Sequence, residues 1–154
     1  GFTLREAALA VSISGLIGSA VGLSVPHFVA KVLDQRLIIV VITLMSTVSF
    51  FMITVQSGAI LYLWLALSNI GISIIFPIVL MQSGFKSDSP EATRNLSTMF
   101  QSIGYTLSAT GPFLLGKVYD STGSWDKAMY VVVGFTFIQL FFGIIVGKPS
   151  KVEY

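Results

Sequence analysis

The sequence contains no cysteine and very little charge, and both shortages narrow what the protein can do. Without cysteine, thiol chemistry is excluded. Charged residues make up only 10% of the 154 residues, whereas they make up about a quarter of a soluble domain. A domain with so few charges would lack a surface that water can solvate. The composition therefore indicates a protein embedded in a membrane.

Residues that carry enzymatic chemistry are also scarce. The chain has no H-E-x-x-H motif, no nucleophile elbow and no pair of carboxylates inside its apolar segments, so we expect no enzyme. The single histidine, His27, has no acidic neighbour, and we therefore expect no metal and no cofactor. The net charge is only +2 and the basic residues are dispersed, so we expect no nucleic-acid partner.

Long hydrophobic segments are what the sequence does have. Hydrophobic residues make up 54% of the chain, and its mean hydropathy is +0.86. A helix needs roughly 20 apolar residues to cross the hydrocarbon core of a bilayer, and five segments approach or exceed that length. The sequence therefore predicts an all-α, polytopic membrane helix bundle in a lipid bilayer, with spans at residues 4–30, 37–55, 59–83, 90–118 and 129–146.

Local signals mark several ends of these spans. Thr3 and Glu6 have the spacing of a capping box, which predicts the start of the first helix. Residues 56–58, Gln-Ser-Gly, divide an uncharged run that is too long for one span, and they predict a turn. Ser89 followed by Pro90 predicts the start of the fourth span, and Pro77 is expected to kink the third.

The third and fourth spans each carry polar residues along one side at helical spacing. Uncharged hydrogen-bonding groups are costly in lipid unless they face protein, water or a ligand. One interpretation is that both polar sides line a cavity, with Asn69 opposite Gln101 and Tyr105. Polar packing against a neighbouring helix is the alternative. The candidate cavity residues are Asn69, Ser73, Gln101, Tyr105 and Ser108.

Small residues line part of the first span, where Gly15 and Gly22 share one face and Gly18 begins a G-x-x-x-G row. Small residues let helices approach closely in lipid. Plain helix packing explains them, and a thin face that borders a cavity is the functional alternative.

Basic residues predict the orientation. Six of them flank one set of span ends, at Lys31, Arg36, Lys86, Arg94, Lys148 and Lys151, against three on the opposite side, at Arg5, Lys117 and Lys127. Because cytoplasmic loops carry the excess of lysine and arginine, we expect the first set in the cytoplasm. The protein would then be a multi-pass protein of the inner (plasma) membrane, with its C-terminus cytoplasmic.

The stretch FPIVLMQSGFKSDSPEATRNLSTMFQSIGYTLSATGPFLLGKVYDSTGSW resembles the last third of major facilitator superfamily transporters, and most closely the branch of cyanate and 2-nitroimidazole porters. The similarity lies in Phe76-Pro77, residues 101–105, Gly111-Pro112 and residues 120–125. The stretch VPHFVAKVLDQR resembles the turn between spans eight and nine. Ala30 stands where an acidic residue is common, although Asp34 and Arg36 remain at this cytoplasmic turn.

This resemblance covers nearly the whole chain and implies spans eight to twelve, five helices of the C-terminal six-helix half. It implies a secondary active transporter that moves a small solute, such as a small organic or inorganic anion, by alternating access. The missing N-terminal half would be a partner, the first, third and fourth spans would line the cavity, and the second and fifth would face lipid. Residues implied in helix packing or gating are Gly15, Gly18, Gly22, Pro77, Gly104, Gly111 and Pro112. The alternative is a small self-contained membrane subunit or assembly partner without transport activity of its own.

Overall fold

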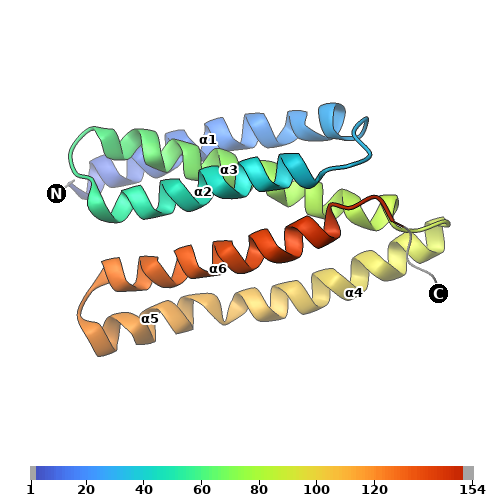
Figure 1. The fold of residues 1–154 in the computed structure, drawn as a ribbon. Helices are drawn as coiled ribbons and strands as arrows, with labels where there is room; N and C mark the ends of the chain where they lie inside the picture. The colour runs from blue at the N-terminus through green and yellow to red at the C-terminus, as the bar shows by residue number, and fades with distance from the viewer. Residues whose placement is uncertain (1–2, 151–154) are drawn as a thin grey trace.

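The computed structural model describes residues 3–150, and this part of the chain is a bundle of α-helices without strands (Figure 1). The all-α class predicted from the sequence is therefore confirmed. The helices are α1 (Leu4–Val29), α2 (Arg36–Val55), α3 (Ile60–Phe85), α4 (Pro90–Ala109), α5 (Gly111–Thr122) and α6 (Trp125–Val146).

Three of the predicted boundary signals are confirmed. The backbone N–H of Thr3 donates to the Glu6 carboxylate at 2.8 Å, and the N–H of Glu6 donates to Thr3 Oγ1 at 3.3 Å, which completes the capping box. Ser89 Oγ accepts from the N–H of Ala92 at 3.1 Å and begins α4. Gly58, in the predicted turn, has φ +73°, a conformation that favours glycine.

The segment expected as one span at residues 90–118 is two helices in the structure. The α-helix stops at Ala109, and α5 starts at Gly111 and continues to Thr122. Pro112 has no N–H to donate back along the helix, and the N–H of Thr110 instead contacts the carbonyls of Leu107 and Ser108. Pro77, in contrast, lies inside the uninterrupted helix α3.

Within the described chain, four helices are long and apolar enough to cross a membrane: α1, α2, α3 and α6. The segments α4 and α5 are not among them, because the polar stripe lowers the apolarity of α4 and α5 is short. The structure is thus a helical membrane bundle in which the predicted fourth span is the atypical one.

Helices joined by a turn lie antiparallel, whereas α1 and α3 are parallel and α5 continues α4 in the same direction (Figure 1). Helix α1 lies at one edge of the bundle and the α4–α5 pair at the other. Helix α3 packs against α1 and α2, α2 packs against α6, and α5 packs against α6. The connections before α2 and α4 lie at the same end as the residues that follow α6, where the N–H of Gln35 donates to the Gly147 carbonyl at 3.1 Å. These segments carry the basic residues grouped on one side from the sequence, except that Lys151 lies outside the described residues.

Small residues allow the closest helix contacts. A Cβ atom added at Gly18 would lie 2.6 Å from Ser73 Oγ, and one at Gly22 would lie 2.8 Å from the Ser73 carbonyl oxygen. The small-residue row of α1 therefore packs against α3. Farther along the bundle, α1, α2 and α3 share a small apolar core that contains the buried side chains Val25, Val29, Ile39 and Ile78.

Helix α2 joins α6 through polar side chains rather than apolar ones alone. Thr47 Oγ1 and Thr136 Oγ1 lie 2.8 Å apart in a buried hydrogen bond, and Gln139 Nε2 donates to Thr43 Oγ1 at 3.3 Å. The same threonine, Thr47, also contacts the Thr43 carbonyl of its own helix at 2.8 Å. The one amide that interrupts the apolar sequence of α6 is thus part of a helix–helix contact.

Candidate functional site

The polar side of α3 faces α1. Asn69 Nδ2 donates to Ser14 Oγ of α1 at 3.2 Å and to the Leu65 carbonyl of its own helix at 3.0 Å. Ser73, one turn farther along α3, lies against Gly18 and Gly22. In this structure the Asn69 side chain therefore packs against the neighbouring helix α1 through a polar contact. Such packing is the alternative to a cavity lining that the sequence left open.

A groove runs along the outside of this α1–α3 contact. It has a volume of about 470 Å³, and its lining includes Ser19 and Gly22 of α1 with Ser73, Phe76 and Pro77 of α3. Three candidate residues, Gly22, Ser73 and Pro77, therefore line a surface that is open to another helix or a solute. Gly15 lies away from close neighbours, since a Cβ added there would meet nothing within 4 Å in the described chain.

The polar side of α4 is open. No residue of α4 is buried by the described chain: Gln101 is half-buried, Tyr105 is 58% exposed and Ser108 is exposed. Ser108 Oγ donates to the Tyr105 carbonyl at 3.0 Å. Gly104 and Gly111 have open space where a Cβ would be. Gln101, Tyr105 and Ser108 are thus grouped on one accessible helix face, as their spacing predicts.

The structure divides the candidate cavity residues into two groups. Asn69 and Ser73 belong to the α1–α3 interface, and Gln101, Tyr105 and Ser108 belong to the free face of α4. In the part of the chain that the structure describes, no hydrogen bond joins Asn69 to Gln101 or Tyr105.

Helices α3 and α4 meet instead through hydroxyl groups near their connection. Ser97 Oγ of α4 donates to Ser83 Oγ of α3 at 2.7 Å, and Ser83 Oγ contacts the Leu80 carbonyl at 2.9 Å. Ser87 contacts the Ser83 carbonyl and the Thr93 hydroxyl. This contact could not be predicted from the sequence, because Ser83 has no distinguishing pattern.

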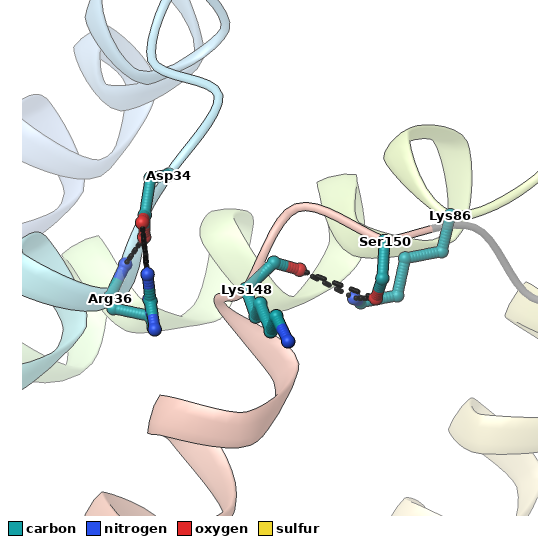
Figure 2. A network of polar contacts seen from close by, with 5 residues as sticks. All are labelled: Asp34, Arg36, Lys86, Lys148 and Ser150. Atoms are coloured by element: carbon teal, nitrogen blue, oxygen red, sulfur yellow. Dashed lines mark hydrogen bonds and ion pairs between the residues drawn. The ribbon is translucent and has the colours of Figure 1, made fainter.

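Asp34 and Arg36 form an ion pair within the turn before α2, shown in Figure 2. Arg36 Nη2 lies 2.6 Å from Asp34 Oδ2, and the N–H of Arg36 donates to Asp34 Oδ1 at 3.1 Å. The side-chain hydrogen bond from Arg36, followed by this backbone N–H, lowers the pKa of Asp34 to about 2. The stability that this ion pair contributes is therefore present at neutral pH, falls progressively as the pH drops below the ordinary aspartate pKa of 3.8, and is lost once the folded carboxylate is protonated near pH 2.

A second polar contact at this end was missed from the sequence. Gln82 Nε2 of α3 donates to Gln35 Oε1 at 2.7 Å, and only 1% of Gln35 is exposed. Lys86 Nζ donates to the Lys148 carbonyl at 3.0 Å and to Ser150 Oγ at 3.1 Å. The only sequence signal for this contact was that Gln35 and Gln82 each lie near the end of an apolar segment.

Among residues 3–150, no group of three His, Asp or Glu side chains could hold a metal ion.

Taken together, the fold and the polar helix faces define a multi-pass helical membrane protein. Comparisons with known proteins show which class of membrane protein the chain resembles. The chain is 28% identical to the 2-nitroimidazole transporter of Escherichia coli (strain K12) over 153 residues, 99% of this chain and 39% of that protein. The chain therefore spans well under half of that relative's length.

Two further relatives are also named as transport proteins. A "Putative anionic 4-hydroxy-benzoate permease" of Thauera aromatica is 29% identical over 91 residues, 59% of this chain and 56% of that protein. An uncharacterized transporter of Bacillus subtilis (strain 168) is 31% identical over 77 residues, 50% of this chain and 19% of that protein. No protein-family model matches the chain, and no solved structure matches it. The similarity is to membrane transporters and permeases, not to enzymes.

Proposed function

We propose that this chain is the C-terminal helix bundle of a secondary active transporter of the major facilitator superfamily, which moves a small solute by alternating access. The observation that carries the proposal is the similarity to a named transporter along 99% of the chain. The bundle would move against a first half of the transporter, with the solute bound between them. The same proposal puts the protein in the inner (plasma) membrane.

The proposal assigns α4 and α5 together to one membrane span, the fourth along the chain, in addition to the four spans α1, α2, α3 and α6. A 20-residue helix such as α4 is about 30 Å long, which matches the hydrocarbon thickness of a bilayer. Its exposed polar face would be costly against lipid. We therefore assign this face, with Gln101, Tyr105 and Ser108, to a water-filled cavity shared with the rest of the transporter.

The proposed solute is a small molecule, an organic or inorganic anion among the candidates. Two relatives are named for 2-nitroimidazole and for anionic 4-hydroxybenzoate, both small ring compounds with polar groups. The α4 face carries neutral groups only, the Gln101 amide and the Tyr105 and Ser108 hydroxyls. These groups can hydrogen-bond a solute but cannot neutralise its charge, so a cationic partner would come from the other half.

Uptake into proteoliposomes that contain the full-length protein tests the proposal, with 2-nitroimidazole and 4-hydroxybenzoate as the first solutes. Gln101→Ala should lower uptake about tenfold if a buried ligand group loses its partner. The amount of protein in the membrane should stay nearly unchanged. Ile103→Ala, on the apolar side of α4, is the matched control and should transport normally. Normal uptake by Gln101→Ala would contradict the assigned cavity.

The alternative, a small self-contained membrane subunit or assembly partner without transport activity of its own, predicts no uptake even by the full-length protein. The proposal expects residues 1–154 alone to insert into the membrane without transporting, because the polar face of α4 would lack its cover. Uptake by the purified 154-residue chain alone would instead favour a small carrier that assembles from copies of itself.

A further inference from the structure

A pocket at one end of the bundle brings together parts of the chain that are far apart in sequence. It has a volume of about 270 Å³ and lies where residues 147–150 pass beside the end of α3 and the turn before α2. Its polar lining consists of Gln35, Gln82, Lys86, Lys148 and Ser150. Figure 2 shows Lys86, Lys148 and Ser150 together, with the Asp34–Arg36 pair to one side.

Among the described residues, no carboxylate lies in the lining of this pocket to balance its positive charge. Lys86 donates to the Lys148 carbonyl and to Ser150 Oγ, and both acceptors are neutral. The described lining contains a second ammonium, from Lys148. The nearby Asp34 is already paired with Arg36 at 2.6 Å. The bonds of Lys86 therefore position its ammonium group without neutralising it.

Partial desolvation of Lys86, which lies half-buried at the pocket, disfavours its charged form. The pKa of the Lys86 ammonium is lowered as a result. A bound anion would remove that penalty by restoring a partner for the charge. The two lysines would then form charge-assisted hydrogen bonds, which are the stronger kind in proteins.

Amide groups form the buried wall of the same pocket. Gln35 is 1% exposed and Gln82 is 8% exposed, and the bond between them fixes both side chains at the pocket. Leu33 and Phe85 add apolar surface beside the lysines, and Leu33 is 82% exposed. A site with cations, fixed amides and an adjoining apolar surface suits an anionic headgroup whose chains continue into lipid.

We propose that this pocket binds a phosphate-bearing anion, either the headgroup of an acidic phospholipid or a soluble phosphate compound. Basic pockets between transmembrane helices are a recurrent form of lipid headgroup site. The proposal does not depend on transport, since it concerns ligand binding in this pocket, whose lining shares no residue with the open face of α4.

Native mass spectrometry of the full-length protein in detergent can test this site directly. The lipid arm compares phosphatidylglycerol with phosphatidylcholine, and the soluble arm adds inorganic phosphate alone. Lys148→Gln is the first variant, because no hydrogen bond from its ammonium group would be lost among the described residues; Lys86→Gln is the second. The matched control is Lys117→Gln, in which the ammonium at the opposite end lies over the Phe113 ring at 4.9 Å.

We expect phosphatidylglycerol to bind more tightly than phosphatidylcholine. Each pocket variant should weaken that binding about tenfold, while Lys117→Gln should not. Binding of inorganic phosphate without lipid, reduced by the same variants, would identify a soluble ligand and also support the site. Equal binding of both lipids together with no phosphate binding would overturn the proposal, as would binding that Lys148→Gln leaves unchanged. Transport activity does not enter this readout, so failure here is distinct from failure of the proposed function.

Discussion

Single hydroxyl and amide side chains form hydrogen bonds between these helices. Apolar packing alone would not specify which helix lies beside which. The contacts Thr47–Thr136 and Asn69–Ser14 each connect two different helices. Such bonds in membrane helices average about 0.6 kcal/mol. They are individually weak, but each has a defined geometry and therefore favours one arrangement of neighbouring helices over others.

The threonine pair gives a prediction at this scale. Thr136→Val keeps the side-chain shape and removes a hydroxyl that is 6% exposed. Because Thr47 can still bond to the Thr43 carbonyl, we expect a loss of about 1 kcal/mol or less in stability. Thermal unfolding followed by circular dichroism would measure it. Thr98→Val, an exposed hydroxyl bonded to its own helix at Arg94, should change little, and an equal loss in both variants would contradict the account.

Sequence reasoning was most effective for residues with strong local signals. The Thr3–Glu6 capping box and the Ser89 cap are confirmed because both depend on neighbours three residues away. The partners of Asn69, Gln82 and Gln139 could not be predicted. Those bonds depend on which helices pack together, and one sequence does not contain that information.

At the scale of elements, close packing of α1 on α3 depends on two glycines. A Cβ at Gly22 would lie 2.8 Å from a backbone oxygen of α3, so the helices would have to separate. The G-x-x-x-G row predicted such packing from the sequence, although not its partner helix. Gly15 lies on the same helix, where a Cβ would meet nothing within 4 Å in the described chain.

This difference gives a paired prediction. Gly22→Ala should destabilise the bundle by about 1–3 kcal/mol, the usual cost of overpacking. Gly15→Ala should be neutral or slightly stabilising, because alanine favours the helix and nothing obstructs it. Unfolding in a denaturing detergent, followed by circular dichroism, would compare the two. Equal stability of the variants would show that α1 and α3 do not approach as closely as described.

The break between α4 and α5 shows the limit of reading elements from apolar length. Residues 90–118 were expected as one helix because their stripes continue across Gly111 and Pro112. The stripes are continuous, and α4 and α5 follow one another end to end (Figure 1). Thr110 keeps a helical conformation, with φ −77° and ψ −17°, but the helical hydrogen-bond pattern is interrupted there, because Pro112 has no N–H to donate.

For the whole molecule, the connections between helices lie alternately at the two ends of the bundle when α4 and α5 are counted as one segment. The charge count then predicts which end is cytoplasmic. Single cysteines at Lys31, Ser57 and Ser121 occupy exposed positions. In an otherwise cysteine-free full-length protein, an impermeant thiol reagent added to intact cells should label positions 57 and 121 but not 31. The reverse pattern would invert the orientation.

The central claim is that the polar face of α4 borders water inside a transporter rather than lipid. Cysteine scanning of α4 in the full-length protein measures this most directly, because it needs no known solute. Positions 101, 105 and 108 should react rapidly with an impermeant thiol reagent, and positions 103 and 107, on the opposite side, should react slowly. Equal reactivity around the helix, or faster reaction at 103 and 107, would contradict the claim.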